Sequence, residues 1–250
     1  MILAANSYIR NPPLRLLPKQ VATFNALRYS LDICDISYNR LMENLSDLSE
    51  NGKIGAQTFP VIFLDIWSII NNGVIFKKIL QTEFSLSSDE PFFQELNKCK
   101  NLRDSNQHID ERLSQTLSID DLPIYGSLSW MKFYPNNNEI ILSLIYSGTV
   151  TNKKIASVKN SNQNNDEIEI NEQIQRLEFT NIVRERENGK FVFPEESILI
   201  NQVIIELKWW IEHLESEINN IFKDVENIEN HTSDFIIQLK GWRIKTNGNN

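Results

Sequence analysis

The sequence predicts an α+β protein that is mainly α-helical, with a helical bundle and a small antiparallel β-sheet. Apolar residues recur every three or four positions over long stretches in the N-terminal half and again toward the C-terminus, as in amphipathic helices. Between these stretches the residues are β-branched and aromatic and are separated by turn sequences, as in short strands. We therefore expect a bundle built from 1–122 and 195–230, an antiparallel β insertion in 123–194 between helices three and four, and a C-terminal tail in 231–250.

The first helix is predicted from Pro18, a residue typical of a helix start, to Gly52, which favours a helix end. Its apolar residues alternate spacings of three and four without interruption. This is the seam of a helix that packs lengthwise on an antiparallel neighbour. The seam consists of Phe24, Leu27, Leu31, Cys34, Tyr38, Leu41, Leu45 and Leu48.

The second helix is predicted from Thr58 and is apolar on nearly all sides over 59–70, which is typical of a helix buried in a bundle. The run 71–73, Asn-Asn-Gly, is expected to weaken or kink it. Asp65 lies inside the apolar stretch, so a buried carboxylate there needs a partner. We expect a structural bond from Asp65 to a neighbouring helix.

The third helix is predicted to begin at Ser87–Pro91, where small capping residues precede acids and a proline, and to run to about Leu117. The segments 124–134 and 139–150 then predict a hairpin, and the alternation over 176–184 predicts a further strand. The fourth helix is predicted from about Ser197. We also expect a polar loop at 160–166 and a turn at 187–190. The segment 235–244 is expected to be either a final strand or a docking tail.

One polar stretch of the third helix, 101–113, gathers residues that could carry chemistry. Histidine exchanges protons near neutral pH, and arginine can stabilise charge on a phosphate. On one continuous helix, residues three and four apart are neighbours, so Asp104 would lie one turn from His108 and could orient its ring. The candidate catalytic residues are therefore Arg103, Asp104 and His108.

This pattern resembles the signature of the HEPN family (higher eukaryotes and prokaryotes nucleotide-binding), which is an arginine followed by a polar residue and, after four to six residues, a histidine. Arg103, Asp104 and His108 fit that signature at the four-residue spacing, on the third long helix, where the family carries it. The match covers one helix directly. Many toxins of the family carry a tyrosine shortly after the histidine, and here residues 109–111 are Ile-Asp-Glu.

The resemblance implies a HEPN-like helical bundle and a metal-independent endoribonuclease, in the role of a toxin or antiphage defence effector. RNA would be the substrate, with no metal and no cofactor, and an antitoxin would be a natural protein partner. Because one histidine supplies only one of the acid and base roles, the family solution is a homodimer that brings two motifs into one cleft. The nearly all-apolar second helix and the unbroken seam of the first helix also predict a homodimer, with the third helix near the two-fold axis.

A second interpretation stays open beside the enzymatic one. The charged residues of the motif would then form an ion-pair lattice on a helix surface or in an interface, and the protein would be a catalytically inactive HEPN-like interaction or scaffold module. Its sheet or its apolar second helix would bind a protein partner. The lattice would consist of Arg103, Asp104, His108, Asp110 and Arg112.

Composition narrows the function classes further. The net charge of −8 argues against indiscriminate nucleic-acid binding, although the basic residues near both ends leave room for a local anion-attracting patch. No phosphate-binding glycine loop and no strong zinc pattern occurs in the sequence. Cys34 and Cys99 lie on apolar stripes and are expected as buried, reduced thiols. No secretion signal or spanning segment is evident, which predicts a cytoplasmic protein.

A Glu-x-Lys segment, a pair of tryptophans and two further histidines are expected to have structural rather than catalytic roles. The sequence Glu206-Leu207-Lys208 is similar to the Glu-x-Lys of metal nucleases, but it falls on a predicted helix rather than a strand. Trp209 and Trp210 are expected as core and rim aromatics of that helix. His213 is expected on the surface beside acidic neighbours, and His231 is expected in a loop.

Overall fold

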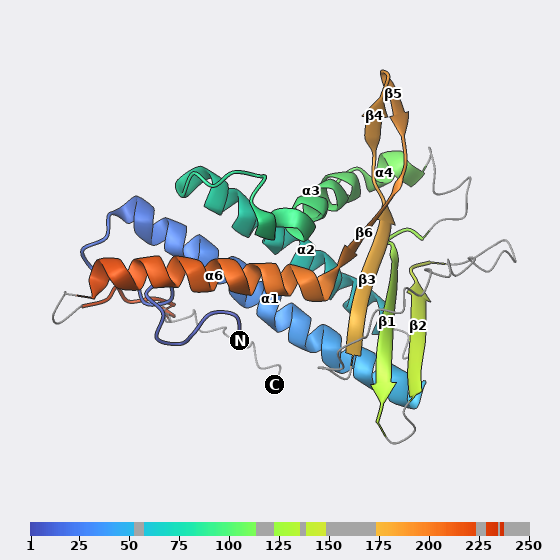
Figure 1. Ribbon diagram of the computed structural model, residues 1–250, viewed down its shortest axis with the longest axis horizontal. Helices are drawn as coiled ribbons and strands as arrows, with labels where there is room; N and C mark the ends of the chain where they lie inside the picture. The colour runs from blue at the N-terminus through green and yellow to red at the C-terminus, as the bar shows by residue number, and fades with distance from the viewer. Residues whose placement is uncertain are drawn as a thin grey trace, which may run out of the picture.

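The computed structural model describes residues 1–52, 58–113, 123–135, 139–148, 174–223, 229–234 and 236–237. It is an α+β structure, mainly helical, with a small antiparallel sheet, which confirms the coarse fold class predicted from the sequence (Figure 1). The helices are α1 (Pro18–Asn51), α2 (Thr58–Glu83), the 3₁₀ helix η1 (Pro91–Phe93), α3 (Gln94–Asn106), α4 (Ile109–Arg112) and α6 (Ile200–Phe222). The strands are β1 (Ser127–Tyr134), β2 (Glu139–Tyr146), β3 (Ile174–Ile182), β4 (Glu185–Glu187), β5 (Lys190–Val192) and β6 (Glu195–Leu199).

Helices α1 and α2 form the predicted hairpin of two long helices. The apolar seam of α1 faces inward, and six of its eight members are fully buried, while Tyr38 and Leu48 pack partly buried against the core. Gly52 ends α1 with a φ of 57°, a left-handed backbone that glycine adopts without strain, and its N–H donates to the carbonyl oxygen of Leu48 at 3.1 Å. The first helix is therefore as predicted.

Helix α2 continues through Gly73 without a break, so the predicted weakening at 71–73 is wrong. The reason for the glycine lies in packing. A Cβ atom at Gly73 would come within 3.0 Å of the Cδ2 atom of Leu96, so its absence lets α3 approach closely. Asp65 is fully buried and binds Arg40 of α1, with Nη2 to Oδ1 at 2.6 Å, which confirms the expected bond to a neighbouring helix.

Helix α2 is also long and apolar enough to cross a membrane by length and composition alone. However, 56% of its most apolar window is buried inside the protein. Such burial is typical of the core helix of a soluble protein.

The sheet is four-stranded and antiparallel, in the order β2-β1-β3-β6. The predicted hairpin is present, with Ser127 opposite Tyr146 and Tyr134 opposite Glu139. The turn at 187–190 joins β4 to β5, as predicted. Strand β6 was not predicted: it pairs with β3 and runs directly into α6, so the sheet extends to residue 199. The polar loop at 160–166 lies outside the described residues.

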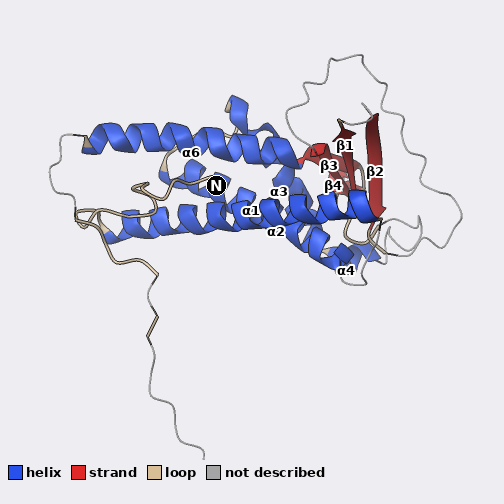
Figure 2. Cartoon of the chain, turned by 90° about the horizontal axis from the view of Figure 1, so that it is seen from below, coloured by secondary structure: helices blue, strands red, loops and turns tan. Residues whose placement is uncertain are grey.

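The sheet stands at one end of the helices and shares their core (Figure 2). The indole Nε1 of Trp130 in β1 donates to the Oγ of Ser49 in α1 at 2.9 Å. The ring of Trp67 in α2 meets that of Phe179 in β3 edge to face, with centroids 5.3 Å apart. Strands and helices therefore bury apolar surface against one another rather than in two separate cores.

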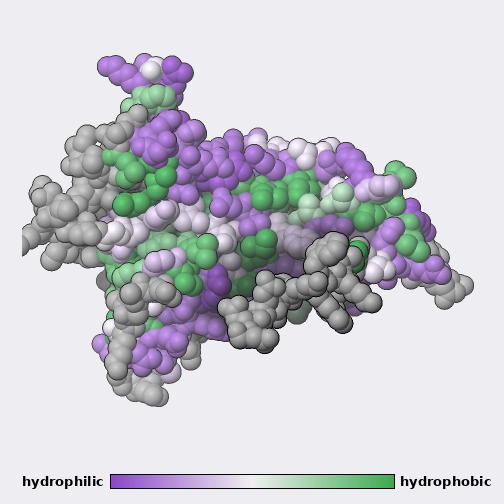
Figure 3. All heavy atoms as spheres, turned by 180° about the vertical axis from the view of Figure 1, so that it is seen from behind, coloured by the Kyte–Doolittle hydropathy of each residue, from purple (hydrophilic) through white to green (hydrophobic). Residues whose placement is uncertain are grey.

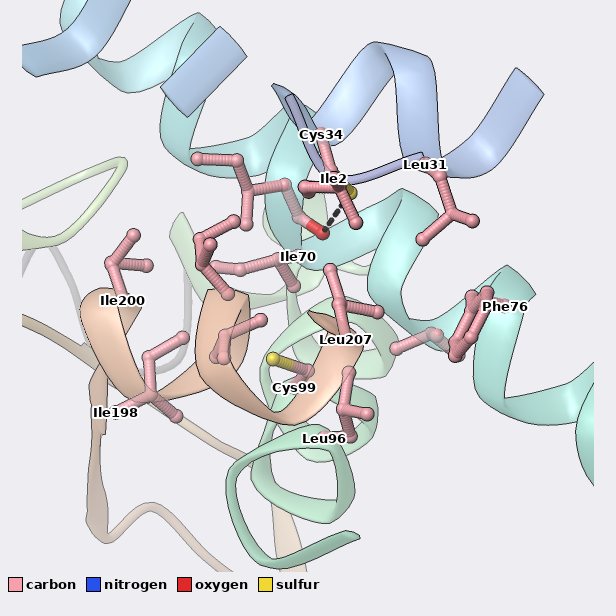
Figure 4. Close-up of a cluster of buried hydrophobic side chains, with 14 of the residues drawn as sticks. Ile2, Leu31, Cys34, Ile70, Phe76, Leu96, Cys99, Ile198, Ile200 and Leu207 are labelled. Carbon is pink, nitrogen blue, oxygen red and sulfur yellow. Dashed lines mark hydrogen bonds between the residues drawn. The ribbon is translucent and has the colours of Figure 1, made fainter. Parts of the chain in front are cut away.

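Both cysteines are free and buried among aliphatic side chains, as predicted (Figure 4). The Sγ of Cys34 lies 3.7 Å from the carbonyl oxygen of Ile69, across the α1–α2 contact. Burial raises the pKa of both thiols well above the ordinary value. Two protonated, inaccessible thiols act as small core residues rather than as nucleophiles.

Helix α6 completes the helical layer through its aromatic residues. Trp210 is buried and donates from Nε1 to the carbonyl oxygen of Phe92 at 2.9 Å. Trp209 is half-buried and stacks on Phe92 with centroids 4.0 Å apart, so the core-and-rim prediction is confirmed. His213 differs from expectation, because it stacks on Trp209 at 5.5 Å and does not pair with an acid among the described residues.

The segment 229–234 lies against the N-terminal segment and α1. The amide of Leu14 donates to the carbonyl oxygen of Glu229 and the amide of His231 to that of Pro12, each at 2.8 Å. Asp234 accepts from the Nη2 of Arg28 at 2.7 Å. Two of the N-terminal basic residues are thus neutralised, Arg28 by Asp234 and Arg10 by Asp32. Apart from 236–237, the segment 235–244, which was expected as a strand or a docking tail, lies outside the described residues.

Candidate functional site

The helix that carries the motif breaks in the middle of the motif. Helix α3 ends at Asn106, His108 has φ −113° and ψ 35°, and α4 begins at Ile109. The single helix predicted to about Leu117 is therefore wrong, and residues 114–117 lie outside the described part of the chain. The end of α3 is held to the sheet, because the Oγ of Ser105 donates to the carbonyl oxygen of Ile182 in β3 at 2.9 Å.

Arg103 and Asp104 bind each other. The Nε and Nη2 atoms of Arg103 both donate to the Oδ1 of Asp104, at 3.0 and 2.5 Å. The Arg103 side chain is 15% exposed and that of Asp104 is 46% exposed. The pair therefore holds the guanidinium in one orientation at the surface end of α3.

The expected contact between Asp104 and His108 is not formed. Because the helix breaks, His108 does not follow Asp104 on one helical face, and its carboxylate neighbour is Glu111 instead. The Nδ1 of His108 lies 3.6 Å from the Oε1 of Glu111, and the imidazole is 48% exposed. No described residue hydrogen-bonds to its Nε2, which leaves that nitrogen available to a ligand.

Arg184 comes to this site from the sheet. It lies between β3 and β4 and donates from Nη1 to the Oε2 of Glu111. Figure 1 shows α4 close to the β4–β5 hairpin, where these segments meet. Glu111 could have been found from its three-residue spacing to His108, whereas nothing in the sequence connects Arg184 with a residue 73 positions earlier.

The charged residues of the motif thus form two groups: Arg103 with Asp104 before the helix break, and His108 with Glu111 and Arg184 after it. No contact among the described residues joins Arg103 to His108. Asp110 is exposed nearby, and the side chain of Arg112 lies outside the described part of the structure. An imidazole oriented through Nδ1 can exchange a proton through Nε2, and a fixed guanidinium can bind a phosphate oxygen. Within the residues described, no three His, Cys, Asp or Glu side chains gather into a metal-binding group.

The Glu-x-Lys segment of α6 has a structural role. The two carboxylate oxygens of Glu206 accept the backbone N–H groups of Glu95 and Leu96, each at 3.0 Å. These are N–H groups of the first turn of α3, which have no partner within their own helix, so Glu206 caps α3. Burial is the main cause that raises the pKa of Glu206.

No family model, curated protein or solved structure matches this chain. The arguments on function therefore rest on the residues and their geometry, together with the resemblance of one short motif.

Proposed function

We propose that the chain is a HEPN-like, metal-independent endoribonuclease, with Arg103 and His108 as its catalytic residues and Asp104 and Glu111 as positioning residues. The observation that carries the proposal is the state of His108. Its imidazole is half-exposed at a helix break, its Nδ1 faces a carboxylate, and its Nε2 is open. A histidine with one ring nitrogen facing a carboxylate and the other open can exchange a proton with a ligand.

The reaction would use the RNA's own 2′-hydroxyl as nucleophile. His108 takes the proton from that hydroxyl, the bond from O2′ to phosphorus forms, and the bond from phosphorus to the 5′-oxygen breaks. The leaving 5′-oxygen receives a proton from an acid, and a 2′,3′-cyclic phosphate remains. Arg103 would stabilise the negative charge that builds on the phosphoryl oxygens during this step.

The second proton carrier would come from His108 of a second copy. One chain offers only one histidine at the motif, and both an acid and a base are required. The apolar surface of α2 gives little reason to expect a dimer, because most of it is buried within the chain. The need for two histidines in one active site is therefore the reason for proposing a dimer. If light scattering finds only monomer under conditions of RNA cleavage, a site composed of two copies is ruled out.

Chelator-resistant cleavage of single-stranded RNA tests the proposal. Arg103→Ala and His108→Ala should each lose about a hundred- to ten-thousand-fold in rate, because each removes a group that acts in the transition state. Asp104→Asn should lose less, since it disturbs only the orientation of Arg103. His213→Ala is the matched control, because His213 is another exposed histidine and should cleave at the wild-type rate. Wild-type protein without such cleavage, or an active His108→Ala, would refute the proposal.

A second candidate function, a scaffold or partner-binding module, is favoured by the edge strand β2. Ile140, Ile141, Leu142 and Leu144 of this strand are between 40% and 51% exposed, on both faces of the sheet. Seen from behind, apolar patches lie at the end of the molecule that carries the sheet and also along the helices (Figure 3). Patches of this kind often mark protein contacts. If Arg103→Ala and His108→Ala abolish an assembly and no RNA is cleaved, this interpretation replaces the first.

A role as a toxin or antiphage effector, with an antitoxin as partner, belongs to the same proposal. Expression of the wild-type chain should then arrest cell growth, and expression of His108→Ala should not. Equal growth with both would leave the enzymatic activity to the RNA assay and remove the toxin role.

A further inference from the structure

A cleft between α2 and α3 is lined almost entirely by polar side chains. Its volume is about 340 Å³, near the lower end of the range for small-molecule sites, which begins at about 300 Å³. Val74 is the one apolar residue of its lining. The polar lining comes from both helices and from the loop between them: Lys77, Lys78, Gln81, Ser88, Asn97, Lys100 and Asn101.

No ion pair among the described residues neutralises the three lysines of the cleft. Among the described residues, no carboxylate forms an ion pair with Lys77, Lys78 or Lys100. The neighbouring Lys98 shows the contrast, since its ammonium lies 2.7 Å from the carboxylate of Glu95. Three ammonium groups that line one small cleft repel one another, so the cleft has a positive potential although the whole chain is acidic.

Lys77 is the most constrained of the three. Only 5% of the surface of Lys77 is exposed. Its Nζ donates to the Oδ1 of Asn97 and lies 5.8 Å from the centre of the Phe93 ring. An ammonium carries three N–H donors, and among the described residues only one has an acceptor. Burial first, and then the nearby Lys100, lowers the pKa of Lys77, while Cys99 and the carboxylate of Glu206 act in the opposite direction. A buried ammonium with two free donors is costly unless something else accepts them.

We propose that this cleft binds a small phosphorylated molecule, with its phosphate group among the ammonium groups of Lys77, Lys78 and Lys100. A phosphate monoester offers several acceptor oxygens and nearly two negative charges, which matches the free donors and the unpaired cations. The amides of Gln81 and Asn101 and the hydroxyl of Ser88 suit the hydroxyl groups of a sugar. Seven of the eight lining residues are polar or charged, which favours a polar ligand over a lipid tail.

This inference does not depend on the proposed ribonuclease activity. The cleft uses Lys100 and Asn101 of α3, whereas the motif uses the last turn of the helix and the break after it. Its ligand is a small molecule and not the RNA substrate.

Calorimetry on the full chain tests the proposal, with ribose 5-phosphate, inorganic phosphate and ribose as the three probes. Ribose 5-phosphate should bind and ribose should not. Binding of ribose 5-phosphate tighter than inorganic phosphate would show that the amide and hydroxyl groups contribute, and equal binding would reduce the site to one for phosphate alone, against the proposed sugar contacts.

Two conservative variants make the test specific. Lys78→Gln and Lys100→Gln change exposed side chains, so both should fold, and each should weaken binding by about tenfold, the loss expected for one charge-assisted contact. Lys190→Gln, on the distant β5 strand, is the matched control and should bind like wild type. The proposal is wrong if both cleft variants bind like wild type, or if Lys190→Gln weakens binding as much as they do.

Discussion

Two groups of charged side chains meet at helix α3, one at its C-terminal end and one on the side that faces α2, and they differ in how they are paired. At the motif, Arg103 meets Asp104, and Glu111 meets both His108 and Arg184. In the cleft against α2, three lysines form no ion pair among the described residues, and the charge of Glu206 acts on Lys77 only through space. A paired charge at a surface can be held for stability alone, whereas a buried cation without an anion opposes folding. The unpaired group is therefore the stronger sign of a ligand, and the paired group needs a chemical test.

A third charged pair, within the core, provides the largest expected effect on stability. Arg40→Ala leaves the carboxylate of Asp65 fully buried without its partner. We expect a loss of about 2 to 3 kcal/mol in the free energy of unfolding, below the full cost of an unpaired buried charge because Arg40 is half-exposed and water can enter. Urea unfolding measures the loss, and Arg40→Lys should recover part of it. A loss below about 0.5 kcal/mol would mean that unpaired buried charges cost little in this fold. The burial of Lys77 would then be weaker support for a bound phosphate.

Lys77→Met should have the opposite sign. It replaces an unpaired buried ammonium by an apolar side chain of similar length, so we expect the free energy of unfolding to rise by about 1 kcal/mol. The same variant should lose binding of ribose 5-phosphate. A variant that is less stable than wild type in the absence of ligand would show that the ammonium is satisfied within the protein.

The pH dependence of stability sharpens the same point. Burial lowers the pKa of Lys77 in the folded protein, so the folded state releases this proton at a lower pH than the unfolded state does. The stability contributed by Lys77 is complete above the ordinary lysine pKa and is lost as the pH falls through the lowered value. The stability advantage of Lys77→Met over wild type should therefore shrink as the pH rises toward the ordinary value, as measured by urea unfolding across the alkaline range. An advantage that grows with pH would contradict this account.

Arg184→Ala should have the smallest effect on stability. Its partner Glu111 is 44% exposed, so the pair contributes about 0.5 kcal/mol or less. Thermal unfolding should barely change. A loss near that of Arg40→Ala would show that the pair fixes the hairpin at the end of the sheet, and the motif would then be better understood as a structural lattice.

The long helices and the hairpin could be predicted because their patterns are local. The seam of α1 and the turn at 187–190 each carry their own signal. The break after Asn106 has no such signal, since neither glycine nor proline occurs there, and a bond from Ser105 to β3 anchors the end of the helix. Strand β6 begins with two glutamates and becomes a strand only through its pairing with β3.

The candidate site was predicted only in part for the same reason. Arg103, Asp104 and His108 were found from their spacing, but the partner of His108 depends on the helix break. Arg184 reaches Glu111 only through the packing of the sheet on the helices. The lysine cleft was missed because Lys77 sits in an apolar run of α2, and no spacing rule brings it together with Lys100 of another helix.

Single-turnover cleavage of single-stranded RNA in the presence of a chelator tests the contrast between the motif and the lysine cleft most directly. The proteins to compare are wild type, Arg103→Ala, His108→Ala, Lys78→Gln and Lys100→Gln. The account predicts a loss of about a hundredfold or more in the two motif variants and wild-type rates in the two lysine variants. Cleavage by His108→Ala at the wild-type rate, or an equal loss in the lysine variants, would contradict it.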